Sequence, residues 1–188
     1  MDKSPIILGK SGRERVIGPI GQASQPALRS DNRQSITMVA SICTAGYVSM
    51  LPTFIFPGKY ILAQWIPHNH MQAIIQVSPN GYITNELALT WLMQFDEATQ
   101  PANREEWCLV ILDNCKNHIT FVFLHYAITH RIEVFGYISH SSTILQGLDR
   151  TCFGTFKTLY QAAVWEFERC LDQNITKELF LELVVEPF

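Results

Sequence analysis

Residues 109–120 read LVILDNCKNHIT, and this stretch decides how the rest of the chain is interpreted. Four apolar residues run directly into Asp113, and His118 follows five positions later. Such an apolar run is typical of a buried strand. An aspartate at its end is either a turn or helix-capping residue or, where other acids converge on it, a metal ligand. From spacing alone the turn residue is the better interpretation.

The segments before this strand show strand patterns first and a helix pattern later. Residues 35–43 (SITMVASIC) and 48–56 (VSMLPTFIF) are β-branched and apolar, which predicts two strands in an antiparallel pair. A short strand is expected at 73–77. A helix is expected from Thr84 onward, because threonine is a good capping residue and apolar residues then recur at helical spacing.

Two strand–helix units follow. Strands are expected at 108–112 and 132–135, and helices at 119–131 and about 150–171. A hairpin followed by βα units predicts an α/β fold, with a mixed sheet flanked by helices.

The composition is that of one ordinary domain. The chain has 188 residues, of which 47% are hydrophobic and 16% charged, so it can bury a sizeable core. We assign residues 1–170 to one domain and 171–188 to a C-terminal tail with a short helix. The net charge of −3 argues against strong, sequence-independent electrostatic binding of DNA by the whole surface. A local basic groove is compatible with this net charge.

The sequence indicates an intracellular protein. The five cysteines are widely spaced and none forms a C-x-x-C pair, so neither a zinc site nor a disulfide framework is indicated. The first 20 residues lack the apolar centre of a signal peptide, and no run of 18 apolar residues predicts a transmembrane helix.

Asp113 and Asp149 both follow predicted strands. Functional groups of an open α/β sheet gather at the carboxyl ends of the strands, and consecutive βα units lie side by side, so both acids can face one crevice. Converging carboxylates repel one another unless a divalent cation neutralises them, and Mg²⁺ prefers oxygen ligands. Two such ions about 3.5–4 Å apart are a known arrangement for phosphodiester chemistry.

Three further segments accompany LVILDNCKNHIT in a fixed order. They are LPTFIFPGK (51–59), GYITNELALTWLMQFD (81–96) and ILQGLDRTCFGTFKTLY (144–160). Together the four resemble DDE-type transposases of the pogo/Tigger/jerky group, which also gave rise to the CENP-B-like proteins. The first quoted stretch resembles the family's LxLDxxxxH segment, and the last resembles its LQPLD segment. The resemblance extends over nearly all of residues 1–165 and implies a ribonuclease H-like catalytic domain.

The resemblance also implies a set of site residues. By position, Asp2, Asp113 and Asp149 match the family's three acids and are expected to hold Mg²⁺ or Mn²⁺ in a two-metal site. His118 and His140 match family histidines, and we expect them beside the metals or the phosphate.

The activity implied is that of a metal-dependent DNA endonuclease or transposase in the nucleus. Its expected partner is DNA, either transposon ends or genomic DNA, and a homo-oligomer is a further option. Lys116 and Lys157 are the candidate contacts to DNA phosphate.

Several positions depart from the family pattern. The chain starts at the first acid, so we expect a chain truncated at the N-terminus, with most of the first strand and the DNA-binding helix-turn-helix region missing and Asp2 on a frayed end. Lys3 stands where the family has glutamate, and Gly147 where it has proline. Residues 138–143 keep only one histidine of the family loop.

These departures support a second hypothesis, a non-catalytic nucleic-acid-binding or interaction module derived from a degenerate transposase. A third, an unrelated α/β hydrolase, lacks the G-x-S-x-G nucleophile motif.

Overall fold

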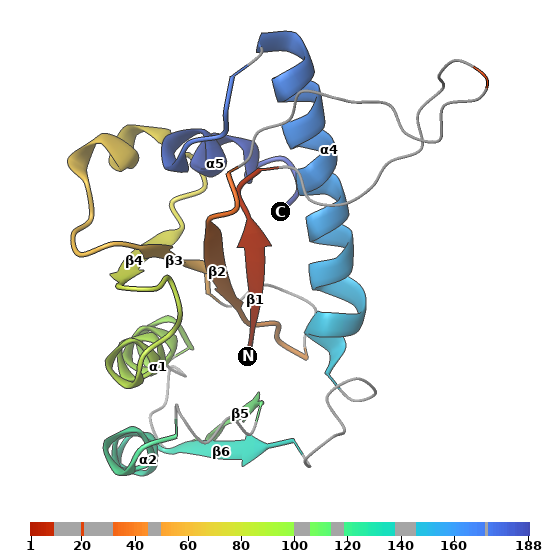
Figure 1. The fold of residues 1–188 in the computed structure, drawn as a ribbon. Helices are drawn as coiled ribbons and strands as arrows, with labels where there is room; N and C mark the ends of the chain where they lie inside the picture. Colours follow the sequence, from red (N-terminus) through yellow and green to blue (C-terminus); the bar gives the residue numbers. More distant parts are fainter. Residues whose placement is uncertain are drawn as a thin grey trace.

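The computed structural model describes residues 1–9, 20, 32–44, 50–99, 106–113, 119–137, 146–171 and 173–188 (Figure 1). Its strands are β1 (Asp2–Ile7), β2 (Ser35–Ala40), β3 (Thr53–Pro57), β4 (Ile74–Ser78), β5 (Cys108–Leu112) and β6 (Ile132–Gly136). Its helices are η1 (Ala63–His68), α1 (Asn85–Thr99), α2 (Phe121–Thr129), η2 (Leu148–Cys152), α4 (Phe153–Leu171) and α5 (Lys177–Leu183).

The described strands form two hydrogen-bonded sheets. One has the order β1-β2-β3-β4, with β1, β2 and β3 antiparallel and β4 parallel to β3. The other is the parallel pair of β5 and β6. The predicted mixed α/β fold is confirmed, as is the antiparallel pair, although its second strand begins only at Thr53.

The first strand is better formed than expected. β1 pairs with β2 over its full length, from Asp2 opposite Ala40 to Ile7 opposite Ser35. The expectation that Asp2 lies on a frayed end is wrong, because this ladder holds its backbone and its side chain is only 5% exposed. The sequence pattern does not predict this strand, because β1 begins with polar residues and contains Pro5. An edge strand such as β1 tolerates a proline.

Two hydrophobic cores lie on opposite faces of the four-stranded sheet. Side chains alternate between the faces of a strand, so Phe54 and Phe56 of β3 enter one core while Ile55 enters the other. The first core packs β1 to β3 against α4 and α5. The second packs β2 and β3 against α1, α2 and the β5–β6 pair. The sheet is therefore flanked by helices on both faces (Figure 1).

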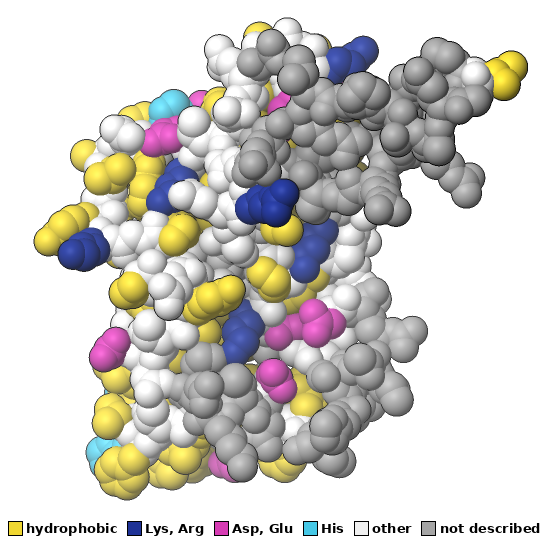
Figure 2. All heavy atoms as spheres, viewed as in Figure 1, with side chains coloured by type: hydrophobic (Ala, Val, Ile, Leu, Met, Phe, Trp, Pro, Cys, Tyr) yellow, Lys and Arg dark blue, Asp and Glu magenta, His cyan; other side chains and the backbone are white. Residues whose placement is uncertain are grey.

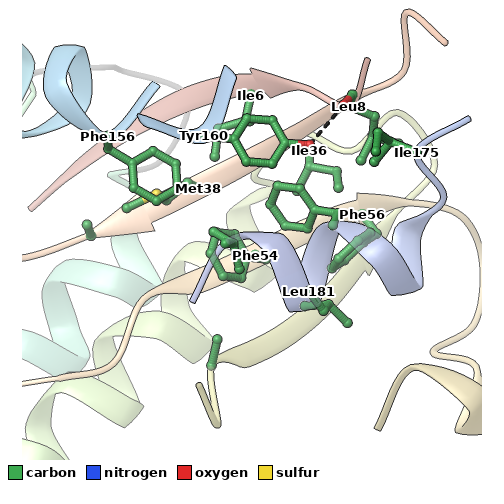
Figure 3. Packing of buried hydrophobic residues seen from close by; sticks show 14 of the residues in the cluster. Ile6, Leu8, Ile36, Met38, Phe54, Phe56, Phe156, Tyr160, Ile175 and Leu181 are labelled. Carbon is green, nitrogen blue, oxygen red and sulfur yellow. Dashed lines mark hydrogen bonds between the residues drawn. The ribbon is translucent and has the colours of Figure 1, made fainter. Parts of the chain in front are cut away.

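A hydrogen bond in the first core joins α4 to the end of β1. The Tyr160 hydroxyl on α4 donates to the carbonyl oxygen of Leu8, which directly follows β1, at 2.8 Å (Figure 3). Both residues are fully buried, and burial raises the pKa of Tyr160 above its ordinary value. A buried tyrosine normally finds such a partner, and here the bond fixes α4 against the end of β1.

The C-terminal helix α5 belongs to the same core. Phe180 is fully buried and makes edge-to-face contacts with Phe54, Phe56 and Tyr160, with ring centroids 5.1, 5.8 and 5.4 Å apart. Thr176 caps the helix by accepting a hydrogen bond from the Leu179 N–H. The short helix expected in the tail is present, while the division of the chain at residue 170 stays a prediction.

Polar contacts hold α5 against η1. Glu178 Oε1 accepts hydrogen bonds from Gln64 Nε2 at 2.7 Å and Trp65 Nε1 at 3.1 Å. One turn further, Glu182 Oε1 lies 2.6 Å from His68 Nδ1. None of the helices in the described ranges is long and apolar enough to cross a membrane.

Candidate metal centre

Three acids from distant parts of the chain come to one end of the structure. Asp2 begins β1, Asp113 directly follows β5, and Asp149 lies in η2. The backbone nitrogen of Met1 donates to the Ile111 carbonyl oxygen at 2.7 Å, so the start of β1 meets the end of β5. β1 also contacts η2. Figure 2 shows acidic side chains gathered between the N-terminal end of β1, the start of α4 and the β5–β6 pair.

Asp2 is the buried member of this group. Its Oδ1 accepts a hydrogen bond from the Lys3 N–H at 2.7 Å. Its Oδ2 is buried and has no hydrogen-bond partner. An unpartnered buried carboxylate oxygen is destabilising, and a cation is the kind of ligand that it lacks.

The surroundings of Asp2 also change the pKa of its carboxyl group. Burial is the main reason that the pKa of Asp2 is raised to about 6. The hydrogen bond from Lys3 opposes the rise, and the negative charges of Asp149 and Asp113 add to it. Both acids are therefore close enough to Asp2 to act on its charge, as a shared cation site requires.

The three carboxylates do not form a closed cage. Asp113 and Asp149 are exposed, whereas Asp2 is buried. In the part of the chain that the structure describes, no three His, Cys, Asp or Glu side chains are placed so that they could already hold a metal ion. The donor set itself suits Mg²⁺ or Mn²⁺, because all three ligands supply oxygen.

A π-helical turn carries Asp149. The Phe153 N–H donates to the Leu148 carbonyl oxygen, a bond that spans five residues and not the usual four. The Thr151 hydroxyl donates to the Gly147 carbonyl oxygen at 2.6 Å within the same turn. Such turns are frequent at functional sites. The sequence pattern predicts only a regular helix from about residue 150, so it misses this feature.

Three of the other expected site residues cannot be placed, and the described lysines near the acids are half-buried. Lys116, His118 and His140 lie outside the described residues. Lys157 is half-buried on α4, eight positions after Asp149, which corresponds to about 12 Å along a helix. Lys3, next to Asp2, is also half-buried.

Removing the charge of Asp2 should stabilise the metal-free protein in a pH-dependent way. The folded pKa of about 6 lies above the ordinary aspartate value of 3.8, so folding favours the protonated carboxyl and ionisation weakens folding. Asp2→Asn should raise the free energy of unfolding by up to about 3 kcal/mol near pH 7.5, and the gain should fall to about 0.5 kcal/mol near pH 4. Urea denaturation in the presence of a chelator measures both values.

Glu97→Gln is the control for this experiment, because Glu97 is an exposed acid on α1. It should show no gain of this kind. An equal gain for Asp2→Asn at both pH values would contradict the argument, since only an ionised carboxylate is penalised by burial.

Comparison with protein families identifies a match to a known family. The model of the DDE superfamily endonuclease family matches residues 33–181. A curated protein of Cochliobolus lunatus, the MFS-type transporter clz9, is 28% identical over 185 residues. The match covers 96% of this chain but only 20% of that protein, so the chain spans about one fifth of its curated relative.

Two solved structures share the fold. The Mos1 strand transfer complex aligns with a TM-score of 0.56 at 12% identity, over 99% of this chain and 50% of the Mos1 chain. A pre-cleavage Mos1 transpososome gives 0.55 at 11% identity, over 99% and 51%. The likeness concerns the fold alone, and it confirms the expected ribonuclease H-like architecture.

Proposed function

This chain belongs to the DDE superfamily endonuclease family, and we propose that it is a metal-dependent DNA endonuclease or transposase domain whose Asp2, Asp113 and Asp149 hold Mg²⁺ or Mn²⁺. The observation that supports the site best is the buried, unpartnered Oδ2 of Asp2. Two further acids act electrostatically on this carboxyl, although they are more than 100 positions away in the sequence.

Each acid has a distinct part in the proposed site. Asp2 is the rigid ligand, because its backbone is in a strand ladder and its side chain is buried. Asp113 and Asp149 are exposed at a strand end and a helix start, so their side chains can turn toward a cation beside Asp2. When bound, a pair of such ions activates the attacking water or 3′-hydroxyl and stabilises the leaving oxygen.

The proposed substrate is DNA, either transposon ends or genomic DNA. Figure 2 shows lysine and arginine side chains on the same face as the acidic group, where they can contact phosphates. We assign Lys157 and Lys116 to phosphate contacts, and His118 and His140 to the surroundings of the metals. We further propose that the chain belongs to the pogo/Tigger/jerky group, that it acts in the nucleus and that it self-associates.

Metal titration tests the site directly. Isothermal calorimetry of the folded protein at about pH 7.5, where Asp2 is ionised, should show Mn²⁺ binding. Asp113→Ala should weaken it by more than about 10-fold, because outer partners of metal ligands alone contribute 10- to 100-fold.

Glu133→Ala serves as the matched control, since Glu133 is an exposed acid on the neighbouring strand β6. Its Mn²⁺ affinity should equal that of the unaltered chain. Binding that is absent, or that survives Asp113→Ala unchanged, would refute the metal site.

A second candidate is a non-catalytic nucleic-acid-binding or interaction module with the same fold. Two observations favour it: Lys3 follows the proposed cation ligand Asp2 where the resemblance leads us to expect glutamate, and the three acids do not form a closed cage within the described residues. Mg²⁺-dependent plasmid nicking separates the two candidates.

A further inference from the structure

Gln146, which lies just before the turn η2, carries a buried amide group that makes no hydrogen bond through its nitrogen. The residue is only 3% exposed. Its Nε2 is buried and has no hydrogen-bond partner within the described part of the chain. A buried N–H group without a partner costs the free energy of its lost contact with water. Such a group therefore needs a specific explanation.

Gln146 and Asp2 border the same hydrophobic core. Side chains alternate between the two faces of a strand, so Asp2 shares its face of β1 with Ile6, a member of the first core. Asp2 also lies opposite Ala40, which belongs to that core. Leu148, two positions after Gln146, is a further member. Both polar residues are thus on the face of the sheet that α4 covers.

Three observations bring the segment around η2 to the Asp2 end of this core. β1 contacts η2 (Figure 1). A Cβ on Gly147 would lie 4.0 Å from Cδ1 of Ile42, which follows the ladder partner of Asp2 by two positions. The charge of Asp149 acts on the Asp2 carboxyl. An unpartnered donor and an unpartnered acceptor therefore lie at the same end of the first core.

The two open groups are chemically complementary. Oδ1 of Asp2 already accepts a hydrogen bond from the Lys3 N–H, whereas Oδ2 has no partner. An ionised carboxylate only accepts hydrogen bonds, and the amide nitrogen of glutamine only donates them. Carboxylates that ligate a metal ion are themselves hydrogen-bonded by outer partners, which fix their orientation. Gln146 has the donor that Asp2 lacks for this purpose.

We propose that Gln146 is a positioning residue of the candidate metal centre, whose side-chain amide donates to Oδ2 of Asp2 when the site holds a cation. This inference rests on the proposed function. Without a cation, the negative charges of Asp2 and Asp149 repel each other. The repulsion disappears when both acids ligate one cation. The segment that carries Asp149 also carries Gln146, three positions earlier, so it brings the amide to Asp2 as the site closes.

Gln146→Met in the full chain tests this role by calorimetry with Mn²⁺. Methionine has a similar length but no amide group. The affinity should fall by about 10-fold or more, as it does when an outer partner of a metal ligand is lost. The midpoint of urea denaturation without metal should not fall, because the substitution removes an unsatisfied buried group. A side chain that only fills the core would lower the midpoint and leave the affinity unchanged.

NMR gives a direct view of the amide group. The side-chain signal of Gln146 is assigned by its absence from the spectrum of Gln146→Met. Addition of Mg²⁺ should move its proton signals downfield and slow their exchange with water, because a hydrogen bond forms. Gln94 on α1 is the matched control, since its Oε1 is also buried and unpartnered but α1 packs on the second core. Its side-chain signal should stay in place, and Gln94→Met should bind Mn²⁺ like the unaltered chain.

The outcomes separate this role from the proposed function. If the unaltered chain binds Mn²⁺ and Gln146→Met binds it equally well, the role of Gln146 is refuted and the metal site stands. An equal loss of affinity in Gln94→Met, a lower metal-free midpoint in Gln146→Met or an amide signal that ignores Mg²⁺ also overturns the role. An unaltered chain that binds no Mn²⁺ refutes the metal site itself, and the role of Gln146 with it.

Discussion

If the chain has the proposed activity, Asp149→Ala should lower Mg²⁺-dependent nicking of supercoiled plasmid by more than about 100-fold, because the loss of an outer partner of a metal ligand alone costs 10- to 100-fold. Asp149 is exposed at the π-helical turn before α4, and its charge acts on the buried Asp2. Its removal takes away one of only three proposed oxygen ligands. The conversion of supercoiled to open-circular plasmid, followed on agarose gels over time, measures the effect.

Glu166→Ala is the control on the same helix, because Glu166 is exposed on α4 and pairs with Arg169 within one helical turn. It should nick at the unaltered rate. Nicking that persists in Asp149→Ala would refute the assigned triad. An unaltered protein that binds DNA but nicks nothing in Mg²⁺ or Mn²⁺ would support the non-catalytic module.

Phe180→Ala destabilises the whole domain by about 3–5 kcal/mol, the usual range for a buried phenylalanine. Phe180 is fully buried and its ring contacts three aromatic rings from β3 and α4. Its removal leaves a cavity between the sheet and α5 that these large rings cannot readily close. The change in the free energy of unfolding is measured by urea denaturation.

Phe121→Ala is the matched control, because this phenylalanine on α2 is 82% exposed. Its effect should stay within about 0.5 kcal/mol. A loss below about 1 kcal/mol for Phe180→Ala would show that α5 is a separable tail and not a part of the core.

The sequence predicts most buried elements correctly. The strand at Cys108–Leu112 has its predicted limits, and α1 begins at the expected position with Ala88, Trp91 and Leu92 buried. These segments are readable because a single face or the whole strand is apolar, and such burial leaves a periodic pattern. The positions of Asp113 and Asp149 after strands are readable for the same reason, but their assignment as metal ligands comes from the family resemblance and stays a prediction.

Features that depend on partners far away in the sequence are not readable in this way. β1 begins with Asp2 and Lys3 and contains a proline, so its strand character depends on pairing with β2, more than 30 positions later. The burial of Asp2 and its unpartnered oxygen depend on the same tertiary packing. The π-helical turn at Asp149 is a local change of hydrogen bonding that leaves no mark on the hydrophobic pattern.

The bond between Tyr160 and Leu8 spans 152 positions in the sequence. This separation determines when the first core can form during synthesis on the ribosome. A ribosome that adds about 5–20 residues per second needs roughly 10 to 30 seconds to synthesise that interval. During this time Ile6, Leu8 and Ile36 lack the helix that will cover them. Domains dominated by such long-range contacts fold slowly. The nascent N-terminal half therefore exposes apolar surface until α4 is made, and Asp149 can approach Asp2 and Asp113 only after η2 has been synthesised.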